Sequence, residues 1–363
     1  MAGPRGLPAW VDVGLIPILN LAVALIIAGL VVIVIGESPL QALSILLNGA
    51  VGSLKGWGYL LYYATNFTFT GLAVAIAFHA GLFNIGGEGQ VYIAGLGAGI
   101  VGLGLGFLPW PILLPLAILA CMAFGAGWAF IPAYLQAKRG SHIVITTIMF
   151  NYIAASLMVY VVINVFRPVG RMAVESREIT SIAMPSFRQI GLWLGVKLPN
   201  TPLNVTVFLA IVAAWALWYL LWRTRLGYEI RTVGANVDAA VYAGIRPGRI
   251  IIITMLISGG LAGLMAVNEI LGVQHRLVLE FAGGAGFVGI AVALMGRSHP
   301  VGVVLAAMLF GLLYQGGTEL SFAKPAITRD MIVVIQGLVI LFMGALEQAF
   351  RPWLVPLFSR QEA

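Results

Sequence analysis

Charge is scarce in this sequence. It has 20 basic and 13 acidic residues, so 33 of its 363 residues, or 9%, are charged, whereas a soluble domain carries about 25%. The apolar content is 61% and the mean hydropathy is +1.01. Too few charged groups remain to solvate the surface of a chain this long. The shortage excludes an ordinary soluble α/β fold and a disordered chain, and it predicts an integral membrane protein.

Cysteine and catalytic motifs are scarce as well. Cys121 is the only cysteine and lies in an apolar run, so we interpret it as a packing residue. No group of His, Cys, Asp and Glu has the spacing of metal ligands. The sequence holds no nucleophile–base motif and no GxxxxGK[ST] phosphate loop. We therefore predict no catalytic residue, metal site or cofactor in this chain, and any ATP must be bound by another chain.

Long apolar runs are abundant. A bilayer core about 30 Å thick needs roughly 20 apolar residues in a helix. The runs are Val13–Ile35, Leu60–Phe78, Gln90–Phe107, Ile112–Ala137, Ile143–Phe166, Leu203–Trp222, Ile250–Leu271, Phe287–Met295, Val301–Gln315 and Met331–Leu346. The eighth is too short to cross alone and suggests a broken helix. The fold class predicted is an all-α polytopic membrane protein with about ten transmembrane helices and glycine-rich broken segments.

The basic residues set the predicted orientation. With ten spans both termini share one side of the membrane. Five arginines fall in the short segment Arg223–Arg249, whereas five basic residues of the opposite side are spread along Arg167–Pro202. Because short loops rich in Lys and Arg stay inside, we place both termini in the cytoplasm. The net charge of +7 sits at the ends of apolar runs, which argues against a nucleic-acid footprint.

We treat residues 1–363 as a single transmembrane domain with three structured connections. Ser38-Pro39-Leu40-Gln41 is a helix start, with an N-cap residue before a proline, and residues 38–57 are expected along the outer interface. Residues 167–202 form an outer loop, which either folds over the outer mouth as a docking site or serves as a partly ordered connector. Residues 223–249 form a cytoplasmic loop.

A glycine-rich polar break runs from Phe78 to Gly95. Inside a membrane, such backbone is tolerated only within protein or against a water-filled cavity. A buried carboxyl group there suggests a transport path or a structural pair. Glu88 therefore either contacts a solute or caps the amides of a broken helix, with Asn84 tying two helices together. A second break, Gly283–Phe287, precedes the short eighth run, and paired interruptions point to a transport path, although close helix packing also explains the glycines.

The cytoplasmic loop contains a predicted helix of about two turns, from Asn236 to Gly244. Asn236 is a favourable N-cap, Asp238 complements the positive helix end, and Gly244 suits a left-handed C-terminal position. Such a short helix is marginal alone in water. Its interpretation is either a peg for another protein or an ordinary connector.

Four stretches resemble the permease subunits of bacterial ABC importers for simple sugars and nucleosides, which are related to branched-chain amino acid permeases. They are GLFNIGGEGQ (Gly81–Gln90), ITTIMFNYIA (Ile145–Ala154), GYEIRTVGANVDAAVYAGI (Gly227–Ile245) and GAGFVGIAVALMGRSHPVG (Gly284–Gly302). With the spacing between them they cover about two-thirds of the chain. One departure is His142-Ile143, where family members often carry an acidic residue.

The resemblance implies a ten-helix permease domain in the bacterial cytoplasmic membrane, in contact with lipid. It implies a partner ATP-binding subunit that holds ATP and Mg, a second and related permease subunit, and an extracytoplasmic solute-binding protein. The coupling residues that it implies are Arg231, Gly234, Asn236, Asp238, Ala239, Ala240 and Gly244. Together with the polar breaks, it indicates translocation-path candidates, which are Asn84, Glu88, Gln90, Asn151 and Phe287. The solute expected is a nucleoside or a simple sugar.

Two alternatives remain at this point. An ion-coupled secondary transporter would use Glu88 as its titrating group, and it predicts transport by the purified chain alone. An intramembrane enzyme is disfavoured because the sequence shows no catalytic constellation.

Overall fold

A computed structural model describes residue 11 and residues 15–345, which form helices and loops with two isolated β-bridges. The first helices are α1 (Ile16–Val34), α2 (Pro39–Val51), α3 (Leu54–His79), α4 (Gly87–Gly104), α5 (Trp110–Arg139), α6 (Ile143–Val161), the π-helix η2 (Val162–Phe166) and α7 (Phe187–Trp193). The later ones are α8 (Thr206–Arg223), α9 (Arg225–Ala235), α10 (Val237–Tyr242), α11 (Pro247–Ala266), the π-helix η3 (Val267–Gln274), α12 (Ala285–Met295), α13 (Pro300–Ala323) and α14 (Arg329–Ala345).

Each of the ten predicted apolar runs overlaps a helix in its described residues, while Val13, Gly14 and Leu346 lie outside the described part of the chain. Among the described residues, six helices are long and apolar enough to cross a membrane: α3, α5, α6 with η2, α8, α11 with η3, and α13. A seventh candidate is the pair α1 and α2, which bend by 117° at the break between them. The segment Ala285–Met295 is a shorter apolar helix, as its length predicted. Ten crossings and a cytoplasmic position of the termini stay predictions.

The chain divides into two compact units, residues 1–56 with 312–363 and residues 57–311. In the first unit α1 packs on α14 and on α2. The predicted helix start is confirmed, because α2 begins with Pro39 at N1 after an extended Ser38, although the Ser38 side chain makes no capping hydrogen bond. Lys324 Nζ pairs with Glu37 Oε2 at 2.8 Å within this unit. A single permease domain and the interfacial placement of residues 38–57 stay predictions.

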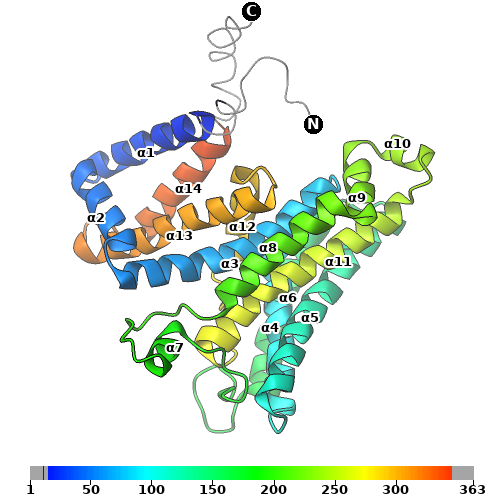
Figure 1. The fold of residues 1–363 in the computed structure, drawn as a ribbon, viewed down its shortest axis with the longest axis horizontal. Coiled ribbons are helices and arrows are strands. Elements are labelled where there is room, and N and C mark those ends of the chain that lie inside the picture. The colour runs from blue at the N-terminus through cyan, green and yellow to red at the C-terminus, as the bar shows by residue number, and fades with distance from the viewer. Residues whose placement is uncertain (1–10, 12–14, 346–363) are drawn as a thin grey trace, which may run out of the picture. The chain divides into compact units, whose positions relative to one another are not determined.

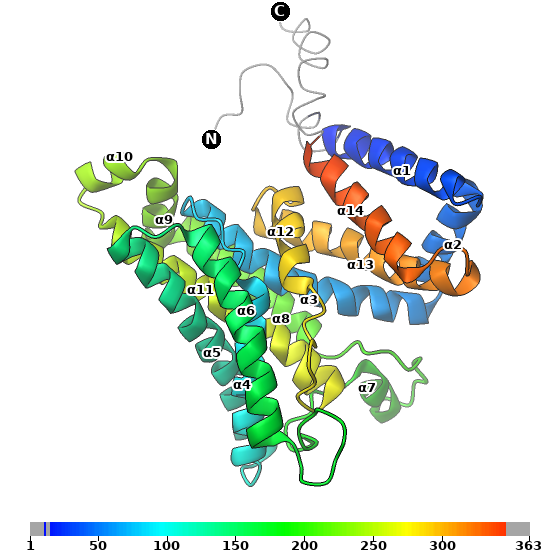
Figure 2. The same ribbon diagram turned by 180° about the vertical axis from the view of Figure 1, so that it is seen from behind.

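The second unit is built around α4. This helix is buried along nearly its whole length and packs against α5, α6, α11 and α12, and Figure 1 and Figure 2 show α4, α5, α6 and α11 side by side. Nine of its eighteen residues are glycine or alanine, a composition that lets backbones approach closely. The core of this unit therefore lies where the glycine-rich break was predicted.

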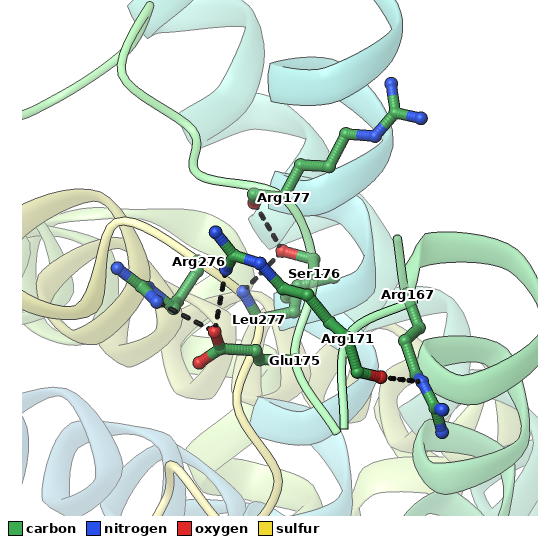
Figure 3. A network of polar contacts seen from close by, with 7 residues as sticks. All are labelled: Arg167, Arg171, Glu175, Ser176, Arg177, Arg276 and Leu277. Atoms are coloured by element: carbon green, nitrogen blue, oxygen red, sulfur yellow. Dashed lines mark hydrogen bonds and ion pairs between the residues drawn. The ribbon is translucent and has the colours of Figure 1, made fainter. Parts of the chain in front are cut away.

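The segment 167–202, for which an outer position stays a prediction, contacts the stretch that follows η3 (Figure 3). Glu175 Oε1 accepts hydrogen bonds from Arg171 at 3.0 Å and from Arg276 at 2.9 Å. Ser176 N donates to Leu277 O at 3.0 Å, and Leu277 N donates to Ser176 Oγ at 2.9 Å. The short helix α7 carries a complete capping box between Ser186 and Gln189. The segment is thus a fixed part of the second unit, and its docking role stays a prediction.

Candidate functional site

The two glycine-rich breaks meet at Glu88. This residue lies in the first turn of α4, and its Oε1 and Oε2 accept hydrogen bonds from the backbone N–H groups of Gly284 at 2.9 Å and Gly286 at 2.8 Å. Those amides are at the N-terminus of α12, where backbone donors lack helical partners and negative charge is favoured. A Cβ on Gly286 would collide with the Glu88 backbone. Two breaks about 200 residues apart in sequence thus form one junction.

Asn84 joins three helices at the same level. Its side chain is fully buried, and Nδ2 donates to Ser258 Oγ on α11 at 2.8 Å and to Gln90 Oε1 on α4 at 3.1 Å. Its Oδ1 accepts from Gly86 N at 2.9 Å and from Gln90 Nε2 at 3.2 Å. Ser258 Oγ in turn donates to Ala73 O on α3 at 2.6 Å. Because each polar atom of Asn84 has a partner, Asn84 is satisfied by protein groups, which is one of the two settings that the sequence left open for this break.

Asn151 completes this arrangement from α6. Its Nδ2 donates to Ile85 O at 2.9 Å, and its Oδ1 accepts from Gly89 N at 2.9 Å. Phe287, on α12, lies apart from the polar group with about half of its side chain exposed. The structure therefore brings Asn84, Glu88, Gln90 and Asn151 together, and their bonds are those of a helix cap and of interhelical ties. A role in the translocation path stays a prediction for all five residues.

Residues 223–249, for which a cytoplasmic position stays a prediction, contain the predicted capped helix. The Asn236 side chain accepts a hydrogen bond from Ala239 N at 3.0 Å and starts α10. Gly244 ends the turn with φ +77°, a conformation that costs glycine little. Asp238 and Ala239 are exposed, whereas Ala240 is fully buried. α10 is therefore a projection: Ala240 is its one buried residue, its other side chains are exposed, and Asn236 caps its first turn.

α9 connects this projection to the membrane helices. Thr224 caps α9 by accepting from Gly227 N at 3.1 Å, and Arg231 Nε lies 3.4 Å from Gly227 O. A Cβ on Gly234 would collide with His79 O at the end of α3. The His79 ring in turn lies 5.4 Å from that of Trp222 at the end of α8. Of the predicted coupling residues, Gly234 thus lies against the end of α3, and Asn236, Asp238 and Ala239 are exposed on the projection.

A second buried polar cluster was not predicted from the sequence. Glu269, on η3, has only 3% of its surface exposed. Tyr62 and Asn66 on α3 both donate to its Oε1, Asn66 at 2.6 Å. The signal that could have revealed it is the Asn268–Glu269 pair inside the run Ile250–Leu271, since an ionisable residue in an apolar span is a functional-site hypothesis by itself.

Metal binding has no candidate in the described part of the chain. No three His, Cys, Asp or Glu side chains there come close enough to hold an ion.

Comparison with known proteins then identifies the bundle. Residues 56–344 match the family described as "Branched-chain amino acid transport system / permease component". The chain belongs to this family of ABC transporter permeases. The match takes in the Glu88 junction, the Glu269 cluster and the α9–α10 projection, so all three are features of the permease domain.

Individual relatives match over most of their length. A guanosine ABC transporter permease of Bacillus subtilis is 35% identical over 91% of this chain and 93% of its own. A glucose ABC transporter permease of Haloferax volcanii is 34% identical over 93% and 89%, and a nucleoside ABC transporter permease of Lactococcus lactis is 32% identical over 91% and 90%. Bacillus subtilis and Lactococcus lactis each have a further matching permease of the same transport class, 28% identical over 69% and 70% of this chain.

Proposed function

We propose that this chain is the membrane-embedded subunit of an ABC importer that carries nucleosides or simple sugars across the bacterial cytoplasmic membrane. The observation that carries the proposal is the similarity to a guanosine permease over 91% of this chain and 93% of the relative. Relatives named for nucleosides and for glucose match over nearly as much of the chain, which supports a small polyhydroxylated solute. Both termini lie in the cytoplasm in this proposal.

The importer has further subunits in this proposal. A second permease pairs with this one, because the guanosine and nucleoside systems of two organisms each have two related permeases. ATP and Mg are held by a separate ATP-binding subunit, and an extracytoplasmic protein delivers the solute. This chain then performs no covalent chemistry, and it serves as a gate that its partners open and close.

The α9–α10 projection is where the ATP-binding subunit docks. The side chains of Val237, Val241 and Tyr242 are more than half exposed, with Tyr242 at 97%, so a six-residue helix presents apolar surface outside the bundle. A compact exposed apolar patch on a short capped helix favours a protein partner. Because α9 is seated on the ends of α3 and α8, a force on α10 is transmitted to two membrane helices.

The energetic demand on the permease is small. It needs two packings that differ by a few kcal/mol, and the ATP-bound partner supplies the differential binding that moves the population from one to the other. Glycine and alanine contacts between helices suit such a rearrangement, since close backbone approach depends on shape and involves few interlocked side chains.

The test is uptake by membrane vesicles that hold this permease, its partner permease and the ATP-binding subunit. Ala239→Glu places a charge on the exposed face of α10, and we expect ATP-dependent uptake of labelled guanosine to fall at least tenfold, with loss of ATPase association. Met172→Glu adds the same charge to an exposed site in the outer segment and should leave association unchanged. Normal uptake and normal association in Ala239→Glu would overturn the docking assignment.

A second measurement separates the proposal from ion-coupled transport. The purified chain alone in sealed vesicles should accumulate no guanosine under a proton or sodium gradient. Uphill accumulation by the solitary chain that is abolished in Glu88→Gln would replace the ABC proposal with a secondary transporter.

A further inference from the structure

The Glu269 cluster is a continuous chain of side-chain hydrogen bonds through the second unit. Asn66 on α3 donates to Glu269 Oε1, and Asn268 Nδ2 donates to Asn66 Oδ1 at 2.7 Å. Asn204, just before α8, donates from Nδ2 to Asn268 Oδ1 at 2.8 Å. With Tyr62 at its other end, the cluster joins five polar side chains from three segments that are far apart in sequence. We call these residues, Tyr62, Asn66, Asn204, Asn268 and Glu269, the amide cluster.

Asn66, Asn268 and Glu269 bond to side chains, and Asn204 also ties the end of the cluster to the backbone of Pro202 and Thr206. The Glu88 carboxyl group differs because it accepts from two backbone N–H groups, in addition to its bond with the Tyr92 side chain. A solute hydroxyl both donates and accepts a hydrogen bond, so it can replace a carboxamide at Glu269 or at Asn66 with no net loss of bonds. Asn66, Asn268 and Glu269 are each no more than 4% exposed, so their bonds form in a setting with little water, where an unpaired polar group is costly. If the number of hydrogen bonds stays the same, the exchange of one partner for another has a low free-energy cost in either direction.

The backbone that carries two residues of the amide cluster is π-helical. Asn268 and Glu269 lie on η3, an eight-residue π-helix that continues α11, and π-helical turns occur frequently at functional sites. Converting a π turn to an α turn shifts the register by one residue, which rotates the side chains beyond it by about 100°. Such a shift carries Asn268 and Glu269 away from α3 without separating the helices.

Aromatic rings flank the amide cluster on α3. The Tyr62 and Tyr63 rings lie 5.1 Å apart at 56°, and both side chains are half-buried. The Tyr62 hydroxyl reaches Glu269, and the Tyr63 ring stacks on that of Phe67 with 6.4 Å between the ring centroids. The polar chain and a row of aromatic rings thus adjoin on α3, and a base that stacks on Tyr63 takes the place of Phe67. Aromatic faces stack with nucleobases, at about 1–3 kcal/mol per base, while carboxamides and a carboxyl group bind hydroxyls.

We propose that the amide cluster, with the Tyr62–Tyr63 pair, is a transient binding site for a nucleoside on the translocation path, where the ribose hydroxyls replace the side-chain partners of Asn66 and Glu269 and the base stacks on the tyrosines. This inference rests on the proposed function and narrows its solute to a nucleoside. It assigns transport to the amide cluster and leaves the Glu88 junction as the fixed frame beside it.

The chain offers a favourable background for the test, because Cys121 is its one cysteine and is buried. In the Cys121→Ala importer, with both permeases and the ATP-binding subunit in vesicles, Asn66→Cys is exposed to a membrane-impermeant methanethiosulfonate reagent. We expect modification at least tenfold faster during ATP turnover than at rest, and at least fivefold protection by millimolar guanosine. Ala73→Cys, also buried on α3, is the matched control and should stay unmodified in both states.

Two results would overturn the inference. One is an Asn66→Cys that stays unmodified while the importer hydrolyses ATP and takes up guanosine. The other is modification that guanosine does not slow. ATP-dependent uptake and ATPase association of the Cys121→Ala parent report on the proposed function separately, so its failure is distinguishable from that of the site.

A conservative variant covers the case in which Asn66→Cys does not fold. Tyr62→Phe keeps the ring and removes the hydroxyl, and we expect the KM for guanosine to rise five- to tenfold with ATPase association unchanged. A KM equal to that of the unchanged importer would show that the Tyr62 hydroxyl is a structural tie and would overturn its place in the site.

Discussion

Glu88 and Glu269 are both buried in the same helical unit, yet their partners differ in kind. Glu88 bonds to the Tyr92 side chain and to the backbone N–H groups of Gly284 and Gly286 at a helix N-terminus, and the two backbone donors cannot leave without a change in the helix start. Glu269 is held by the side chains of Tyr62 and Asn66, which can rotate away. The difference teaches that burial of a carboxyl group in a membrane protein does not by itself mark the path, because the nature of the partners decides whether the group can be exchanged.

The strongest challenge to this comparison is to remove the Glu88 carboxyl group. In Glu88→Ala two buried N–H groups at the start of α12 lose their acceptors, at about 1–3 kcal/mol each. We expect severe loss of folded permease, measured as the monodisperse fraction and the Tm in detergent. Glu88→Gln keeps one acceptor oxygen and should fall between Glu88→Ala and the unchanged chain. If the Tm of Glu88→Ala lay within 2 °C (roughly 0.5 kcal/mol) of that of the unchanged chain, the Glu88 junction would not be a stabilising part of the fold.

A pair of glycine substitutions sharpens the same contrast. A Cβ on Gly286 meets the backbone of Gly87 and Glu88, whereas a Cβ on Gly272 meets the carboxamide of Asn204. Backbone cannot swing aside and a side chain can, so Gly286→Ala should cost about 1–3 kcal/mol and Gly272→Ala less than half of that. The measurement is the Tm of both variants in the same detergent, with guanosine uptake as a second reading. Equal losses would mean that the amide cluster is as rigid as the junction.

The sequence predicts the parts of this structure that local physics determines. The membrane helices were predictable because the lengths of the apolar runs match the thickness of a bilayer core. The α10 helix was predictable from Asn236 and Gly244, whose capping roles need only their immediate neighbours. The glycine breaks were visible as well. Their meeting was not, because the bond from Gly284 to Glu88 joins residues 196 positions apart and requires the packed bundle.

Glu269 was missed for a different reason. It lies near the end of the apolar run Ile250–Leu271, which is predicted as one membrane span from its overall composition, and a single carboxyl group does not change that prediction. Its partner Asn66 is 203 positions away in another apolar run. An ionisable residue in such a run has to find a partner or a cavity, but the sequence alone does not say which residue supplies it.

Glu269→Gln separates folding from transport. Tyr62 and Asn66 both donate to Glu269 Oε1, and Gln274 also forms a hydrogen bond with this carboxyl group. A glutamine retains one acceptor oxygen for the first two donors, so we expect the Tm to stay within about 3 °C (~1 kcal/mol) of the unchanged chain. Guanosine uptake should nevertheless fall at least tenfold, because the site loses an oxygen that accepts ribose hydroxyls. Uptake and Tm are measured on the same preparation, with Asn151→Asp as a control for a polar change in the frame. A large fall in Tm with unchanged uptake per folded permease would reverse the roles of the two carboxyl groups.

A partly exposed ion pair provides the reference for both buried carboxyl groups. Glu229 on α9 pairs with Arg225 at 3.0 Å across one helical turn, and the Glu229 and Arg225 side chains are 23% and 92% exposed. Water and salt screen such a pair, so Glu229→Gln should cost only about 0.3–0.5 kcal/mol, as measured by Tm at low and high salt. The small loss should vanish at about 1 M salt, where the screening length is near 3 Å, whereas the losses in Glu88→Ala should persist, because its partners are amides shielded from solvent. If Glu229→Gln destabilised the chain as much as Glu88→Ala does, burial would not be what separates these carboxyl groups, and the contrast between frame and path would lose its physical basis.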